Sequence, residues 1–273
     1  GEATPAVVSS LALAESLHIV VNEEDEASDY PSRHRLLDAI LAADQPCSLA
    51  AGISSLMWAA THVRERLALD HWHALNRLQR EFAAAQRRGD VSLGNASTLL
   101  DAVLLASSSL TGFAMDNMTR DDGWRFLIAG RRIERLDFLG SAIAGFLQLE
   151  SARGEGGLEW LLELADSIIT YRSRYLSSPQ LIPTLDLVLC DPSNPHSVLF
   201  QVAELRRELD ALATATGERA QGTLDAVEAA LRGCDLSVLE MSLLGEEGQV
   251  DAMRGVADLA TAAADASRAL SDL

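Results

Sequence analysis

Three charged residues at helical spacing, Arg131, Glu134 and Arg135, are the side chains best suited to chemistry in this sequence. They lie in the segment of residues 118–138, which reads as part of a helix. At about 100° per residue, the apolar residues around them form one stripe, and Arg131 and Arg135 fall in its middle. An unpaired buried charge is expensive, so the pattern predicts a buried or half-buried Arg/Glu cluster with Glu134 in a salt bridge. The stripe consists of Trp124, Ile128, Phe138, Ala142 and Phe146.

This cluster has two interpretations. Arginine presents a planar fork that suits carboxylates and phosphates, so the cluster can bind an anionic ligand or a partner. The alternative, which we favour, is a structural ion-pair network that sets the register of packed helices. Arg172 and Arg174 either line the same pocket or complement a helix dipole, and we favour the dipole. The candidate residues are Arg120, Asp121, Trp124, Arg131, Glu134, Arg135, Arg172 and Arg174. The candidate acidic partners are Asp116, Asp121, Asp137, Asp186 and Asp191.

Several kinds of catalytic site are excluded by the residues that the chain lacks. All 22 basic residues are arginine, so neither a phosphate-loop lysine nor a Schiff-base lysine is present. No Gly-x-Ser-x-Gly, His-Glu-x-x-His or Cys-x-x-Cys sequence occurs, and His62, His71 and His73 lack the spacing of a metal site. We therefore predict no catalytic residues, no metal and no cofactor.

The charge balance and cysteine content limit the partners and the compartment. The formal net charge is −18, which argues against nucleic acid or an anionic membrane as the main partner. Three widely spaced cysteines are typical of a reducing compartment, so we expect a cytoplasmic protein. The longest apolar stretch, residues 6–21, contains Glu15 and His18 and is too short to span a bilayer. The acidic loop of residues 22–29 is expected to be solvated, although a basic partner could use it.

Alanine and leucine dominate the composition and β-branched runs are rare, which favours an all-α protein. Thr119 is predicted to cap the charged helix, with Asp122 completing a capping box. The linker of residues 153–157 is the best flexible break. A weak internal repeat of acid, proline, serine and helix, at residues 44–66 and 191–208, suggests two halves. Helices are predicted at residues 4–21, 31–43, 46–67, 70–88, 95–117, 120–151, 158–176, 180–189, 196–215, 218–232 and 248–271.

The sequence resembles the alpha-E domain family, which is named for its helices and a Glu-Arg motif. The most specific matches are Met118-Thr-Arg-Asp-Asp-Gly-Trp-Arg-Phe-Leu127 and Gly130-Arg-Arg-Ile-Glu-Arg135. Further matches are Tyr171-Arg-Ser-Arg-Tyr175, Asp191-Pro-Ser-Asn-Pro-His-Ser-Val198, Val63-Arg-Glu65, Trp72 and Leu75-Asn76. The resemblance covers nearly the whole chain. It implies an all-α bundle of two quasi-repeated halves, residues 1–112 and 113–273.

The first half departs from the family pattern in two places. Its Glu-Arg helix is missing, because Gly1-Glu2-Ala3-Thr4 aligns with the place where that motif would end. We therefore expect a truncated start, with an apolar groove beside residues 4–21. The family's Arg-Glu-Asn-Ala-Arg run is replaced by Met57-Trp58-Ala59-Ala60-Thr61. A polar site is consequently expected in the second half.

Alpha-E domains are encoded beside, or fused to, circularly permuted ATP-grasp proteins. The resemblance therefore implies an accessory, substrate-handling domain of an ATP-grasp amide (peptide) ligase, which handles a peptide or a small anionic substrate and has no activity alone. One alternative is an enzyme domain that acts on a small anionic metabolite through an Arg/Glu pocket. Another is a purely structural oligomerisation bundle.

Overall fold

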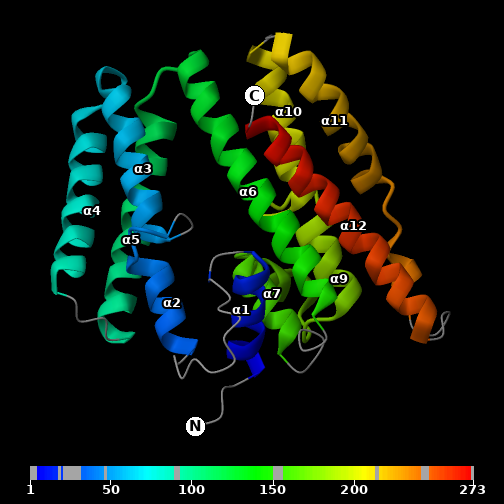
Figure 1. Cartoon of the computed structure of the whole chain (residues 1–273). Coiled ribbons are helices and arrows are strands. Elements are labelled where there is room, and N and C mark those ends of the chain that lie inside the picture. The colour runs from blue at the N-terminus through cyan, green and yellow to red at the C-terminus, as the bar shows by residue number, and fades with distance from the viewer. Residues whose placement is uncertain are drawn as a thin grey trace. The chain divides into compact units, whose positions relative to one another are not determined.

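The computed structural model describes residues 5–17, 20, 32–45, 48–88, 93–149, 156–212, 215–240 and 246–271. The acidic loop of residues 22–29 and the linker of residues 153–155 lie outside these ranges. All regular structure in the described ranges is helical, so the predicted all-α class is confirmed. Contacts divide the chain into two compact units, one formed by residues 1–13 and 121–273 and the other by residues 14–120 (Figure 1). The two quasi-repeated halves divided at residues 112 and 113 stay a prediction.

The smaller unit, residues 14–120, is a bundle in which α4 packs against α3 and α5. Ser48 caps α3, because its hydroxyl accepts a hydrogen bond from the Ala51 amide at 3.1 Å. The helix predicted for residues 46–67 ends at His62 and continues as a single 3₁₀ turn. The elements are α2 (Ser32–Leu41), α3 (Leu49–His62), η1 (Arg64–Arg66), α4 (Leu69–Arg88) and α5 (Leu93–Asp116).

Helix α5 contains the only stretch in the described residues that is long and apolar enough to cross a membrane. Residues 94–116 have a mean hydropathy of 1.4. The core helices of soluble proteins pass the same test of length and composition, so a single such helix is weak evidence for a membrane span.

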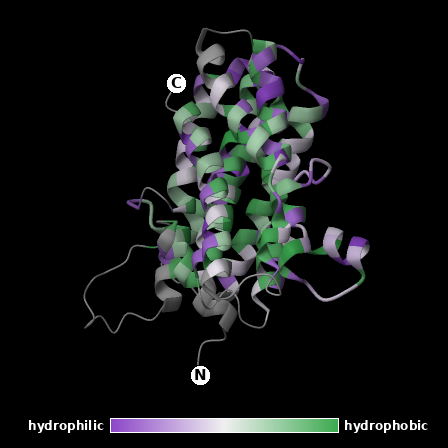
Figure 2. Ribbon diagram, turned by 90° about the vertical axis from the view of Figure 1, so that its right-hand side faces the viewer, coloured by the Kyte–Doolittle hydropathy of each residue, from purple (hydrophilic) through white to green (hydrophobic). Residues whose placement is uncertain are grey.

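The larger unit is built around α6. This helix packs against α12 and α10, and α11 packs against both of those helices (Figure 1). Hydrophobic and hydrophilic residues alternate along individual helices, as expected for helices that bury one side (Figure 2). The elements are α1 (Pro5–Ser16, which continues past the unit boundary), α6 (Asp122–Gln148), α7 (Gly157–Leu164), α8 (Ile168–Tyr175), α9 (Leu181–Leu185), the π-helical turn η3 (Asp186–Cys190), α10 (Val198–Leu212), α11 (Ala215–Arg232), η4 (Leu236–Leu239) and α12 (Glu246–Ser271).

Helices α6 and α12 approach closely because a glycine stands where they cross. A Cβ atom on Gly140 would lie 2.6 Å from the carbonyl oxygen of Ala260 and 3.0 Å from the Ala264 Cβ. No side chain fits in that space, so only glycine allows the two backbones this separation. Small residues on α12 complete the contact, and this crossing fixes the position of α6 in the core.

The start and the buried face of α6 differ from the sequence-based expectation. Asp121 caps the helix, accepting a hydrogen bond from the Trp124 amide at 3.0 Å, so the prediction of Thr119 as the cap is wrong. The core is centred on Leu136, Leu139 and Ile143, which are buried. Phe138, which was placed in the predicted stripe, has 38% of its side chain exposed. The other four residues of the predicted stripe, Trp124, Ile128, Ala142 and Phe146, are buried, so the prediction is right for them. The buried face is wider than predicted and extends to the side of the helix that carries Leu136, Leu139 and Ile143.

Candidate functional site

A polar seam joins α6 to α10. Arg125 Nη1 lies 2.9 Å from Glu208 Oε2, and Arg132 Nη1 donates to Gln201 Oε1 at 3.1 Å. On each helix the two residues are seven positions apart, which is about two helical turns. From the first pair to the second, the residue number rises along α6 and falls along α10. The helices therefore run antiparallel, and the two polar pairs lie about two turns apart along their contact.

The buried carboxylates described in this unit lie on α10, on α11 and, at Asp191, in the turn before α10, and not on α6. Glu208 is 2% exposed and also accepts from Arg207 Nη2 at 3.0 Å. Glu228 is buried and pairs with Arg206 at 2.8 Å and Arg232 at 2.7 Å. Glu208 and Glu228 thus each have two guanidinium partners, as a buried charge requires.

The predicted burial of Arg131, Glu134 and Arg135 is wrong. All three side chains are exposed, and none of them forms an ion pair with any described residue. The physical reason is that the contact with α10 lies on the side of α6 that carries Arg132, which leaves Arg131 and Arg135 exposed. The neighbouring residues Glu134 and Arg135 are both exposed and therefore contribute no ion pair to the core.

Arg132 connects the seam to these exposed arginines. Its guanidinium carbon lies 5.3 Å from the centre of the Phe200 ring, and its Nε is buried without a hydrogen-bond partner among the described residues. Burial lowers the pKa of Arg132, and the charges of Arg131, Arg135 and Arg207 lower it further, while Glu204 opposes them. Burial, and then the charge of Arg135, likewise lower the pKa of Arg131. Three cations are therefore held close together.

His196 lies beside the same cations. Its Nε2 is 3.6 Å from Asp166 Oδ2. Burial lowers the pKa of His196, and the charges of Arg135 and Arg132 lower it further, although Asp166 raises it. We call Arg131, Arg132, Arg135 and His196 the arginine cluster. Arg132 and His196 were not singled out from the sequence; the seven-residue repeats of Arg125 and Arg132, and of Gln201 and Glu208, were the signal that could have identified the seam.

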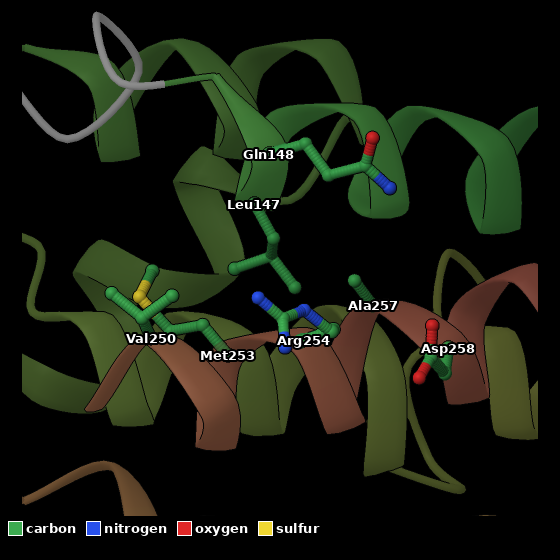
Figure 3. Close-up of a pocket in the computed structure, with 7 residues that line it drawn as sticks. All are labelled: Leu147, Gln148, Val250, Met253, Arg254, Ala257 and Asp258. Carbon is green, nitrogen blue, oxygen red and sulfur yellow. The ribbon is translucent and has the colours of Figure 1, made fainter. Parts of the chain in front are cut away.

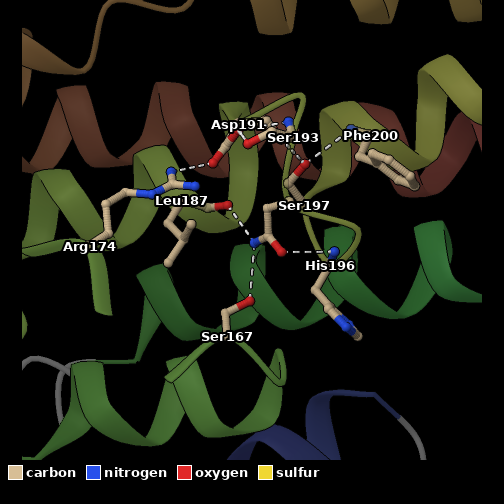
Figure 4. A network of polar contacts seen from close by, with 9 residues as sticks. Ser167, Arg174, Leu187, Asp191, Ser193, His196, Ser197 and Phe200 are labelled. Atoms are coloured by element: carbon tan, nitrogen blue, oxygen red, sulfur yellow. Dashed lines mark hydrogen bonds and ion pairs between the residues drawn. The ribbon is translucent and has the colours of Figure 1, made fainter. Parts of the chain in front are cut away.

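The turn before α10 positions His196 (Figure 4). The amide of buried Asn194 donates to Leu187 O at 2.9 Å and to Ser167 Oγ at 3.1 Å, and its Oδ1 accepts from the His196 backbone N–H at 3.1 Å. Ser197 then caps α10 by accepting from the Phe200 amide at 3.0 Å. A single buried amide therefore ties the π-helical turn, the segment before α8 and the start of α10 together.

The two arginines of α8 pair with carboxylates that lie outside the arginine cluster. Arg174 forms an ion pair with Asp191, as Figure 4 shows, and Asp191 Oδ1 accepts from the amide and hydroxyl of Ser193, each at 2.7 Å. Burial pushes the pKa of Asp191 up, but the hydrogen bonds from Arg174 and Ser193 outweigh it, and the pKa is lowered. Arg172 makes an exposed contact with Glu159 at 3.8 Å.

The other candidates at the start of α6 act locally. Arg120 Nη2 donates to the Met115 carbonyl oxygen at 2.5 Å at the end of α5. Asp121 is the helix cap and Trp124 is buried.

The three arginines of the arginine cluster are distinguished by forming no ion pair with a carboxylate among the described side chains. Among the side chains described for residues 121–273, Arg131, Arg132 and Arg135 are the arginines without an ion pair. All the others have one: Arg125, Arg172, Arg174, Arg206, Arg207, Arg232, Arg254 and Arg268. Carboxylates outnumber arginines 40 to 22 in the chain, so this grouping is not a consequence of composition. It leaves a local cationic site on an acidic protein.

Two further kinds of site, a ligand-sized hollow and a metal site, remain to be considered in the described residues. A hollow of about 380 Å³ lies between the end of α6 and α12, and Figure 3 shows Leu147 and Arg254 on its opposite walls. Its wall contains both charges: Arg254, which is paired with Asp251 at 3.0 Å, and Asp258. In the described parts of the chain, no group of three or more His, Cys, Asp or Glu side chains is arranged to hold a metal ion.

Comparison with known proteins finds relatives in mycobacteria. An uncharacterised protein of Mycobacterium tuberculosis and one of Mycobacterium bovis are each 29% identical to the chain over 198 residues. The match covers 69% of this chain but 22% of each relative, so the chain corresponds to a small part of those proteins. No solved structure matches. The model of the Alpha-E family, described as a predicted alpha-helical domain with a conserved Glu-Arg motif, matches residues 2–273, and the chain therefore belongs to this family.

Proposed function

We propose that this chain is a non-catalytic, substrate-handling domain that binds an anionic group through the arginine cluster and serves a cytoplasmic ATP-grasp amide ligase. The observation that supports it is the set of three adjacent arginines without carboxylate partners on α6. Every other described arginine of the same unit is paired, so the unpaired set marks a place where the protein keeps cationic donors available.

The physical argument concerns the cost of holding like charges together. Burial and mutual repulsion lower the pKa values of Arg131 and Arg132, so their charged forms are stabilised less than in water. An anion that enters the cluster removes this penalty and gains charge-assisted hydrogen bonds from guanidinium forks. The buried Nε of Arg132 is a further donor without a partner. These features favour a carboxylate or phosphate ligand.

The ligase context comes from the alpha-E resemblance. The chain supplies no lysine and no glycine-rich phosphate loop, and an ATP-grasp fold needs a sheet whereas the described residues are helical. We therefore assign the chain a part in holding or delivering the ligase's substrate. The rest of the ligation chemistry belongs to the partner.

Anion binding tests the first half of the proposal. The full chain is titrated with N-acetylglycine and, separately, with inorganic phosphate at low ionic strength, and binding is followed by amide chemical shifts. Losing one charged hydrogen bond is worth roughly 1.5–3 kcal/mol, so Arg132→Ala and Arg135→Ala should each weaken binding about ten-fold or more. The matched control is Arg254→Ala, which removes an exposed, paired arginine and should leave binding unchanged. Equal binding by all variants, or none by the parent, would overturn the anion site.

The ligase half is tested by ATP turnover. The pure chain should hydrolyse no ATP, and addition of the chain to the ATP-grasp protein encoded beside it should raise amide formation. Arg135→Glu should reduce that stimulation, with the larger effect at low salt, because exposed charges act mainly on the association rate. Turnover by the chain alone would support the enzyme alternative. Unchanged ligase activity would refute the accessory role.

A further inference from the structure

The exposed face of α6 points to a more specific ligand. We propose that the arginine cluster binds the α-carboxylate of an amino acid or peptide C-terminal residue that carries an apolar side chain, with that side chain lying on Phe138, one helical turn from Arg135. This inference rests on the proposed anion site. It adds the chemical class of the ligand and the residues that select it.

The first support is the order of side chains along the face. Leu127, Arg131, Glu134, Arg135 and Phe138 recur every three or four residues, so they lie on one side of the helix. All five are exposed, Leu127 at 40% and Phe138 at 38%. The face therefore presents cations in the middle and a large apolar side chain at each end. A ligand with a carboxylate next to an apolar group matches this order.

The second support is Glu134, which stands between the two exposed arginines without an ion pair to any described residue. In an amino acid, an ammonium group stands next to the α-carboxylate; in the C-terminal residue of a peptide, an amide N–H stands there. Both groups donate hydrogen bonds that the Glu134 carboxylate can accept. Arginine for the carboxylate and glutamate for the adjacent nitrogen together recognise the α-carbon substituents shared by the two ligands.

The third support concerns the choice of a carboxylate over a phosphate. Phosphate sites commonly use backbone N–H groups at a helix start. Near the start of α10, the N–H groups of His196, Phe200 and Gln201 already donate, at 3.1, 3.0 and 3.2 Å, to Asn194 Oδ1, Ser197 Oγ and Ser197 O. Asp166, Glu204 and Glu134 border the cluster and repel a dianion more strongly than a monoanion. Guanidinium forks suit a planar carboxylate.

The test compares ligands that differ by one group, each titrated into the full chain. N-acetylphenylalanine should bind about ten-fold more tightly than N-acetylglycine, because its ring gains apolar contact. N-acetylphenylalanine amide, which lacks the carboxylate, should not bind, and inorganic phosphate should bind more weakly than N-acetylphenylalanine. Phe138→Ala should bring N-acetylphenylalanine down to the affinity of N-acetylglycine and leave N-acetylglycine unchanged. Leu127→Ala, about 16 Å along the helix from Phe138, is the matched control and should leave both affinities unchanged.

The outcomes separate this inference from the anion site on which it rests. Equal affinity for the two acetylated amino acids, or tighter binding of phosphate, would overturn the inference while the anion site stands. Absence of binding by every ligand would overturn both. Free phenylalanine distinguishes the two sources: the unchanged protein should bind it more tightly than N-acetylphenylalanine if the amino acid is the ligand, and more weakly if the peptide end is.

Discussion

Arg125 Nη1 lies 2.9 Å from Glu208 Oε2, and this pair joins α6 to α10 across a distance of 83 residues in the sequence. The two oxygens of Glu208 are both used, because Oε1 accepts from Arg207 Nη2 at 3.0 Å. Glu208 is 2% exposed, so its charge depends on these two guanidinium groups for solvation. The contact that sets the α6–α10 seam is thus an ion pair with almost no access to water on the acidic side.

Removing the carboxylate of Glu208 should therefore be costly. We expect Glu208→Ala to lower the free energy of unfolding by about 3–5 kcal/mol, because it leaves Arg125 half-buried without its anion. Glu204→Ala is the control on the same helix, since Glu204 pairs with the exposed end of Arg207 and should cost about 1 kcal/mol or less. Urea denaturation midpoints measure both, and equal losses would contradict the assigned role.

The crossing of α6 and α12 predicts opposite effects for two glycines of one helix. Gly140→Ala should destabilise the protein by about 1–3 kcal/mol, because its Cβ would meet the Ala260 carbonyl oxygen at 2.6 Å. Gly130→Ala has nothing within 4 Å of the new methyl group and should stabilise by about 0.5–1 kcal/mol. Thermal melts of both variants test this, and the same sign for both would count against the close approach.

The helical class could be predicted from composition and periodicity, whereas the buried face of α6 was predicted only in part: Trp124, Ile128, Ala142 and Phe146 are buried and Phe138 is exposed. Apolar residues occur on two overlapping stripes of this helix, and only the packing of α10 and α12 decides between them. The expectation of buried Arg/Glu pairs was right in type and wrong in position: Arg125 and Arg132 face α10, whereas Arg131 and Arg135 stay exposed. The partner carboxylate lies 83 residues away, which spacing within one helix cannot show.

Asn194 should control the position of His196. Asn194→Ala leaves Leu187 O, Ser167 Oγ and the His196 N–H without this partner, so we expect a loss of at least about 2 kcal/mol of stability. Under conditions where the variant is folded, its affinity for N-acetylglycine should also fall. Ser193→Ala, at the neighbouring exposed position, should leave that affinity intact. An unchanged affinity in Asn194→Ala would show that the turn does not position the site.

His71 makes the stability of the smaller unit depend on pH. It is 4% exposed, its ring centre lies 5.0 Å from that of Phe113, and neither ring nitrogen has a hydrogen-bond partner among the described residues. Burial lowers the pKa of His71, and Asp70 opposes this only in part. The unfolded chain, in which the pKa is about 6.5, therefore takes up the proton more readily. Stability is fully present above that pH and is lost as the pH falls below it.

The variant His71→Leu should remove this loss. Its stability relative to the parent should rise as the pH is lowered from 7.5 to 5, because only the parent must bury or expel a proton. Denaturation midpoints at several pH values give the difference directly. A difference that stays constant over this range would contradict the assignment.

Cys190 should be unreactive while the protein is folded. Burial, followed by the nearby Cys234 and Asp186, raises the pKa of the Cys190 thiol to about 12. The thiolate is the nucleophile, so alkylation by iodoacetamide at pH 8 should be at least about a hundred-fold slower than in denaturant. Mass spectrometry of the peptide that carries Cys190 measures the rate. Similar rates in the folded and unfolded states would refute the burial of this thiol.

The division of the chain has a consequence for its synthesis. Residues 1–13 belong to the same unit as residues 121–273, and residues 14–120 form the other unit between them. A ribosome delivers the chain from its N-terminus at about 5–20 residues per second. All residues of the intervening unit therefore emerge after residues 1–13 and before α6. Residues 1–13 can make their contacts within the larger unit only after a second compact unit has been synthesised in between.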